Sequence, residues 1–107
     1  MRILLDHCVD IRFKKELPGH DVSHTKEMGW EQLSNGKLLT VTEENSFDIF
    51  LTVDKNLRFQ QNISKRNFAV ITLGSLFTGL DHIQPLAPKV LALLSSGVEN
   101  GKDYVIS

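Results

Sequence analysis

The stretch Ile49-Phe50-Leu51-Thr52-Val53-Asp54 decides the fold. Every residue before the aspartate is apolar or β-branched, which is typical of a strand that is buried on both faces of a parallel sheet. A second apolar run, Ile3-Leu4-Leu5, opens the chain and also ends in an aspartate, Asp6. Because the chain between these runs has helical spacing, the pattern predicts an α/β domain with a mostly parallel central sheet.

Outward from these two runs, apolar spacing and turn residues divide the rest of the chain into further elements. We expect a short helix over 11–17, a strand over 20–25, a helix from Ser34 or Asn35, strands over 47–53 and 68–73, a helix over 83–94 and an edge strand over 104–106. This order predicts four to five strands with helices on both faces and right-handed crossovers.

Length and composition bound the class of protein. A chain of 107 residues is enough for one core, so we expect a single domain over 1–107. The hydrophobic fraction is 41%, the charged fraction is 23% and the net charge is −1. These values argue against disorder and against a global basic field that would attract nucleic acid. A local basic patch stays open.

Cysteine use and hydropathy indicate the compartment. Cys8 is the only cysteine, so neither an intrachain disulfide nor a multi-cysteine zinc site can form. No apolar run approaches the length that spans a bilayer, and the N-terminus has no secretory signal pattern. We therefore expect a cytoplasmic protein with no membrane partner.

Asp6 and Asp54 are the central candidates for a functional site. If their strands are parallel neighbours, both carboxylates lie at the carboxyl edge of the sheet, where open α/β folds bind their ligands. Paired carboxylates offer hard oxygen ligands to a divalent cation such as Mg²⁺ or Mn²⁺. Asp10 lies one helical turn beyond Asp6 and is a candidate third acid. The structural alternatives are a helix cap for Asp6 or Asp10 and a turn for Asp54 with Asn56.

A polar segment follows Asp54 and carries candidate substrate contacts. Lys55, Asn56 and Arg58 can donate to phosphate oxygens, and Phe59 can stack on a base. A solvated loop without a binding role is the alternative for the same residues.

His7 and Cys8 resemble a metal-binding pair but are adjacent in the sequence. Adjacent residues seldom face one site, so zinc binding is disfavoured. Cys8 is more simply explained as a small buried residue.

Several segments, in order and spacing, carry a family resemblance over most of the chain. They are Met1-Arg2-Ile3-Leu4-Leu5-Asp6, Gly19-His20-Asp21-Val22, Met28-Gly29-Trp30, Asn35-Gly36-Lys37-Leu38-Leu39, Leu51-Thr52-Val53-Asp54-Lys55-Asn56-Leu57 and Gln60-Gln61-Asn62. Together they resemble a bacterial family of small PIN-like proteins, related to the toxin nucleases of type II toxin-antitoxin modules and to the Mut7-C group. The resemblance implies a single PIN-like domain, clustered carboxylates that bind Mg²⁺ or Mn²⁺, an RNA substrate and a small helix-turn-helix antitoxin as partner. A homodimer is a further candidate assembly.

The chain departs from the family pattern at three places, one of which is Asp10, where relatives usually carry a proline or a small residue. His7 stands where relatives usually carry an acid directly after the first aspartate, and the segment 35–37 offers Asn35, Gly36 and Lys37 where an acid is common. A charged lysine cannot bind Mg²⁺, so the usual third ligand is absent from that position.

Three classes of function therefore compete. The first is a toxin of a type II module that cleaves RNA with Asp6, Asp54 and Asp10 as catalytic residues and the first two as metal ligands. The second is a non-catalytic PIN-like binding module, which the missing acid favours. The third and least favoured is a phosphoacceptor receiver-like domain, because receivers also place acids after their first and third strands.

Overall fold

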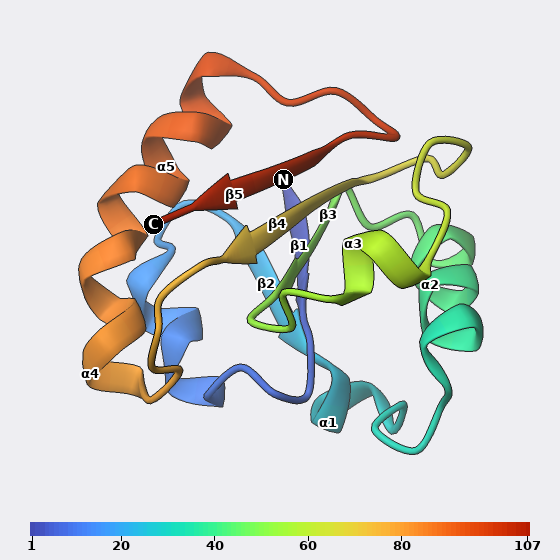
Figure 1. The fold of residues 1–107 in the computed structure, drawn as a ribbon, viewed down its shortest axis with the longest axis horizontal. Helices are drawn as coiled ribbons and strands as arrows, with labels where there is room; N and C mark the ends of the chain where they lie inside the picture. Colours follow the sequence, from blue (N-terminus) through green and yellow to red (C-terminus); the bar gives the residue numbers. More distant parts are fainter.

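Five strands alternate with helical segments along the chain (Figure 1). The computed structural model describes all residues, 1–107. The strands are β1 (Arg2–Leu5), β2 (Asp21–His24), β3 (Ile49–Thr52), β4 (Ala69–Leu73) and β5 (Asp103–Ile106). The helical segments are η1 (Ile11–Glu16), α1 (Thr25–Met28), α2 (Asn35–Glu44), α3 (Leu57–Gln60), α4 (Leu80–Ile83), η2 (Gln84–Leu86) and α5 (Ala87–Ser96).

All five strands form one parallel sheet in the order β2-β1-β3-β4-β5. The predicted α/β class is confirmed, as is the prediction that the two apolar runs are neighbours. In the β1–β3 pair, Ile3 lies opposite Ile49 and Leu5 opposite Leu51. β5 pairs only with β4 and is an edge strand, as expected. Every residue of β3 and β4 is buried, because helices cover both faces of the sheet there.

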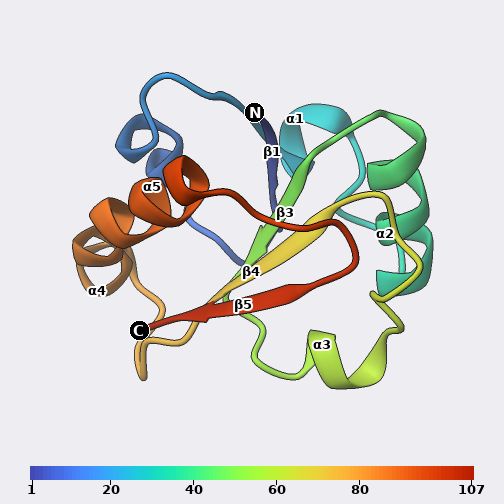
Figure 2. The same ribbon diagram turned by 90° about the horizontal axis from the view of Figure 1, so that it is seen from above.

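The two faces of the sheet have separate hydrophobic cores. Figure 2 shows α5 on one side of the sheet and α2 and α3 on the other. On one face, Phe13 of η1 and Val90 of α5 pack on Leu5 and Leu51. On the other face, Leu38 of α2 packs with side chains of alternate strand residues such as Phe50. This alternation follows from the two-residue period of a strand. It places Asp6 and Thr52, the next residues in register, on the face that α2 covers.

The strand order creates a switch point between β1 and β3. From β1 the chain passes outward to β2, returns to β3 on the other side, and continues to β4 and β5. In open α/β sheets, ligands bind beside the carboxyl ends of the strands that flank such a point. Asp6 follows β1 and Asp54 lies two residues beyond β3, so both candidate acids lie at this place.

The last crossover has the opposite hand to the others, which corrects the expectation of uniformly right-handed connections. The steps β3 to β4 and β4 to β5 run in the same direction across the sheet. α3 crosses on the α2 face, whereas α4 and α5 cross on the η1 face. The loop 74–79 after β4 therefore turns toward η1 (Figure 1). It brings Thr78 and Gly79 beside the loop that follows β1.

Four helical regions differ from the prediction, one of which is α1, a helix that was not predicted. The predicted helix over 11–17 is the 3-10 helix η1. The polar segment after Asp54 contains α3, which the sequence analysis did not predict and which buries Leu57. The single helix expected over 83–94 is divided into α4, η2 and α5. Pro85 and Pro88 lie in the first turns of η2 and α5, as their missing amide hydrogens require. No helix in the structure is long and apolar enough to cross a membrane.

Gly101 is the glycine whose replacement the fold should tolerate least. Its φ is +79°, and a Cβ built there would lie 2.5 Å from the Ser64 carbonyl oxygen. We expect Gly101→Ala to lower the free energy of unfolding by more than about 2 kcal/mol, because backbone strain and a backbone clash add. Urea denaturation measures the loss.

Gly19→Ala is the matched control. Its φ of +85° is equally unfavourable for alanine, but nothing lies within 4 Å of the added Cβ. We expect a loss of about 1 kcal/mol from backbone strain alone. Equal losses for both variants would contradict the assigned contact with Ser64.

Candidate functional site

Asp6 is a buried carboxylate whose oxygens are fully hydrogen-bonded. The residue is 2% exposed. Its Oδ1 accepts from the His7 backbone N–H at 2.8 Å and lies 3.0 Å from the His7 Nδ1. Its Oδ2 accepts from the Thr52 hydroxyl at 2.8 Å and from the Cys8 thiol at 3.4 Å. Four partners use about all the lone-pair positions of a carboxylate.

Thr52 connects the two candidate acids. It is the last residue of β3 and is fully buried. While its hydroxyl donates to Asp6, its oxygen accepts from the Asp54 backbone N–H at 3.0 Å. One hydroxyl group therefore holds the side chain of one acid and the backbone of the other.

Asp54 lies in the turn between β3 and α3 and is partly exposed. Its Oδ1 accepts from the Asn56 backbone N–H at 2.9 Å, which is the turn that the sequence analysis gave as an alternative role. Its other carboxylate oxygen has no hydrogen bond within the protein. Asp54 can therefore act as a turn residue and still offer an oxygen to a ligand.

Asp10 is engaged elsewhere. It caps η1, and both of its oxygens accept from Arg12: Oδ1 from the backbone N–H and Nε, and Oδ2 from a terminal guanidinium nitrogen at 2.7 Å. The hydrogen bonds from the Arg12 side chain and backbone lower the pKa of Asp10 to about 2. Nowhere in the structure do three or more His, Cys, Asp or Glu side chains form a group that could hold a metal ion.

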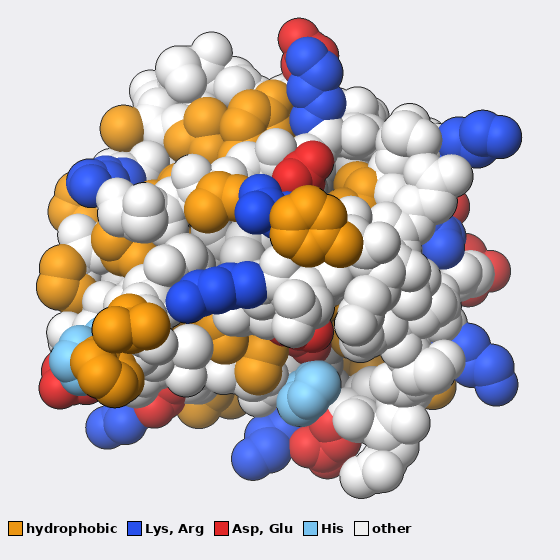
Figure 3. Space-filling model, in the orientation of Figure 1, with side chains coloured by type: hydrophobic (Ala, Val, Ile, Leu, Met, Phe, Trp, Pro, Cys, Tyr) orange, Lys and Arg blue, Asp and Glu red, His pale blue; other side chains and the backbone are white.

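The three candidate phosphate contacts have different surroundings and do not form one site. Lys55 is exposed and forms no ion pair, whereas Arg58 pairs with Asp103 at 3.5 Å and lies over the Phe59 ring at 4.5 Å. Arg58 thus reaches the first residue of β5, away from the carboxyl ends of the strands. Asn56 is exposed and contributes its backbone N–H to Asp54. Lys and Arg side chains are scattered over this face of the molecule and form no single patch (Figure 3).

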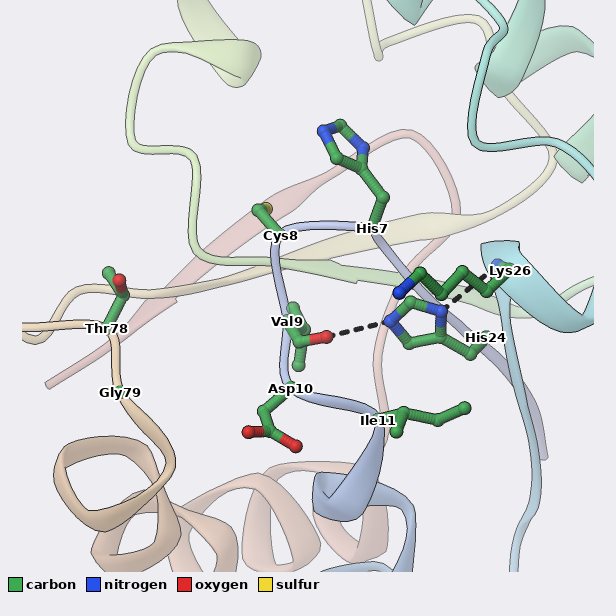
Figure 4. A pocket seen from close by; sticks show the side chains of 9 residues that line it. All are labelled: His7, Cys8, Val9, Asp10, Ile11, His24, Lys26, Thr78 and Gly79. Atoms are coloured by element: carbon green, nitrogen blue, oxygen red, sulfur yellow. Dashed lines mark hydrogen bonds between the residues drawn. The ribbon is translucent and has the colours of Figure 1, made fainter.

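A pocket of about 410 Å³ lies on the η1 side of the same edge (Figure 4). Residues 7–11 form one part of its wall, and His24, Lys26, Thr78 and Gly79 form the rest. His24 is 2% exposed, and its Nε2 donates to the Val9 carbonyl at 2.7 Å. Its Nδ1 accepts from the Lys26 backbone N–H at 3.1 Å, so the ring joins the β1 loop to the start of α1.

Cys8 is exposed, so the prediction that it is a buried residue was wrong. The residue sits on the loop that turns away from the sheet after Asp6, where its sulfur contacts Asp6 and the Thr52 hydroxyl while much of the residue faces solvent. Partial burial of the sulfur and then the negative charge of Asp6 raise the pKa of the thiol above its ordinary value.

Two buried hydroxyls near this edge have no hydrogen-bond partner. Thr72 lies opposite Thr52 in the β3–β4 register and is 1% exposed, and Thr25 follows β2 and is fully buried. Neither Oγ1 atom is hydrogen-bonded in the protein. Thr25, Asp6, Thr52 and Thr72 are therefore buried polar residues at or just after four strands, and of these only Asp6 and Thr52 are hydrogen-bonded to each other.

Sequence reasoning named the two candidate acids but missed the groups that position them. Thr52 was interpreted only as core, although its place two residues before Asp54 lets its side chain accept from the following amide. His24 gave a weaker signal. Glu27 lies three residues after it and accepts from its backbone N–H, which completes a capping box with histidine in place of serine.

Comparisons with protein-family models, with curated proteins and with solved structures gave no match for this chain.

Thr52→Val tests the connection between the two acids. Valine keeps the shape but removes the donor to Asp6 and the acceptor for the Asp54 N–H. We expect the free energy of unfolding to fall by about 1–3 kcal/mol, because a buried carboxylate loses a hydrogen bond. Thr72→Val is the matched control, since its hydroxyl has no partner to lose. We expect that variant to be as stable as the original protein or more stable, and an equal loss in both would contradict the assigned role of Thr52.

The thiol of Cys8 should react slowly despite its exposure. Because its pKa is raised, the thiolate fraction near pH 8 is smaller than for a free cysteine. Iodoacetamide alkylation followed by mass spectrometry across pH 7–10 measures this. Asp6→Asn removes the charge that raises the pKa, so its alkylation profile should shift to lower pH. An unchanged profile in the folded variant would contradict the coupling between Asp6 and Cys8.

Proposed function

We propose that this protein is a PIN-like, metal-dependent RNA endonuclease and the toxin of a type II toxin-antitoxin module. One observation supports metal-dependent cleavage. Asp6 and Asp54 lie at the switch point between β1 and β3 and are joined through Thr52. The toxin role, the RNA substrate and a helix-turn-helix antitoxin rest on the sequence resemblance.

The chemistry of the two acids is compatible with Mg²⁺ or Mn²⁺. Magnesium is commonly held by one or two carboxylates together with water and substrate phosphates, so Asp6 and Asp54 suffice as protein ligands. When bound, such an ion offsets the charge that develops on the phosphate and activates a water. The His7 side chain is 54% exposed, so its ring can turn away and leave the Asp6 Oδ1 with only the His7 backbone N–H as a partner. For Asp10 to serve as a third acid, its carboxylate would have to leave Arg12.

Substrate contacts are proposed on the segment that follows Asp54. Lys55 is the best placed of them, because it is adjacent to Asp54 and its ammonium is free to meet a phosphate. Phe59 is 75% exposed and offers a ring on which a base can stack, with Arg58 against its other face.

One observation favours a non-catalytic binding module as the second candidate. The Asp6 carboxylate already has four hydrogen-bond partners, and the start of α2 offers Asn35, Gly36 and Lys37 in place of an acid. An RNA-binding domain would need Lys55 and Phe59 but no bound metal. A receiver-like domain shares the strand order, but His7 replaces the second acid that receivers carry after their first strand, and this function is the least favoured.

RNA cleavage by purified single variants separates the first two functions. We expect Asp6→Asn and Asp54→Asn each to lower the rate of Mn²⁺-dependent cleavage by at least about a hundredfold, as loss of a group that stabilises developing charge does. Asp10→Asn should have a smaller effect, because its carboxylate is neutralised by Arg12. Glu44→Gln, an exposed acid on α2, is the control and should cleave normally.

The opposite outcome is also informative. Cleavage that persists in the Asp6→Asn, Asp54→Asn double variant would exclude the proposed enzyme. Calorimetric titration of RNA into the protein, with and without Mn²⁺, then tests the second candidate. A non-catalytic module should bind RNA equally well with or without the metal and with or without either aspartate.

A further inference from the structure

We propose that the pocket on the η1 side is a binding site for the phosphate group of a nucleotide. It is distinct from the Asp6 and Asp54 position, because the loop 7–11 separates the two and neither aspartate lines the pocket. The proposal needs no metal and no catalysis. The phosphate can belong to a free nucleotide or to the end of an RNA strand. Only the second of these sources rests on the proposed function.

The charge of the pocket favours an anion. Lys26 lines it, and its ammonium takes part in none of the ion pairs of the structure. In Figure 4 this side chain extends alongside the His24 ring, with its nitrogen directed toward residues 7–9. The one carboxylate in the lining, Asp10, is neutralised by its two-pronged pairing with Arg12. Asp81 lies near Gly79, but its side chain is 84% exposed and its charge is screened by water.

Several residues of the pocket wall have backbone amides without an acceptor in the protein. The N–H groups of Cys8, Asp10 and Ile11 donate to no acceptor in the protein, and neither do those of Thr78 and Gly79 on the loop after β4. Unpaired amides grouped on neighbouring loops form anion-binding concavities, and lysine is a common phosphate ligand. The hydroxyl of Thr78 adds one side-chain donor to this set.

The wall of the pocket is held in place by hydrogen bonds of His24, which also caps α1. His24 fixes both the Val9 carbonyl and the Lys26 amide from a buried position, which sets the distance between the β1 loop and the start of α1. The volume of about 410 Å³ falls within the range of small-molecule pockets. Ile11 lines it too and is 41% exposed, so an apolar surface is present for the sugar or base beyond the phosphate.

Titration of the metal-free, ¹⁵N-labelled protein with inorganic phosphate and with adenosine 5′-monophosphate tests the site. We expect amide shifts concentrated at residues 8, 10, 11, 78 and 79. Lys26→Gln should weaken phosphate binding about tenfold or more, as loss of one charged hydrogen bond does. The variant keeps the backbone N–H that bonds to His24. Lys15→Gln, an exposed and unpaired lysine of η1, is the control and should bind normally.

Two results would overturn the proposal: shifts spread over exposed lysines across the surface, or equal weakening by Lys26→Gln and Lys15→Gln. Short RNA strands with a 5′-phosphate or a 5′-hydroxyl then identify the source. Tighter binding of the phosphorylated strand, lost in Lys26→Gln, assigns the pocket to an RNA end. Equal binding of both strands, with the mononucleotide bound as before, assigns it to a free nucleotide.

Asp54→Asn keeps this test separate from the nuclease proposal. That variant should lose cleavage and retain phosphate binding. A pocket that binds phosphate in a protein that cleaves no RNA would refute the enzyme and leave the pocket intact, whereas the reverse pattern would refute the pocket alone.

Discussion

The buried charge of Asp6 is the constraint on which the carboxyl edge of the sheet depends. A carboxylate at 2% exposure is costly unless hydrogen bonds replace the water that it has lost. The replacements come from the next strand, through Thr52, and from the loop directly after β1, through His7 and Cys8. The same interaction therefore aligns β1 with β3 and determines the path of the loop. Because Thr52 also accepts from the Asp54 amide, the place of the second acid follows from the first.

The unusual hand of the last crossover determines what surrounds this edge. Had α4 and α5 crossed on the same face as α3, the loop 74–79 would have turned away from η1. Instead it carries Thr78 and Gly79 back to the β1 loop, and a pocket forms between them. On this face, α5 buries Val90 and Leu94 against the sheet, and this apolar burial stabilises the crossover.

Features that depend on local pattern could be predicted from the sequence, and features that depend on contacts between distant segments could not. The apolar runs at 3–5 and 49–53 predict buried parallel strands, and their adjacency predicts that Asp6 and Asp54 approach each other. The pairing of Asp10 with Arg12 also depends on local pattern. The sequence analysis instead interpreted the spacing between Asp6 and Asp10 as one helical turn, which would put both acids on one side. In fact η1 is a 3-10 helix that starts after Asp10, and the Asp10 side chain caps it. The exposure of Cys8 and the hand of the last crossover depend on how separate segments meet, which neither periodicity nor composition encodes.

The loop after β1 faces two chemically opposite environments. On the α2 side it supplies donors to a buried carboxylate, and on the η1 side its unpaired amides lie beside the ammonium of Lys26. For the proposed RNA substrate, the acidic position and the pocket beside Lys26 would meet different phosphates of one strand. In the functions proposed above, the acids would hold a cation against one phosphate, while the pocket would receive another directly. Since His24 fixes the loop on the pocket side and Thr52 fixes Asp6 on the other, the spacing between the two environments is set by buried hydrogen bonds and not by mobile surface side chains.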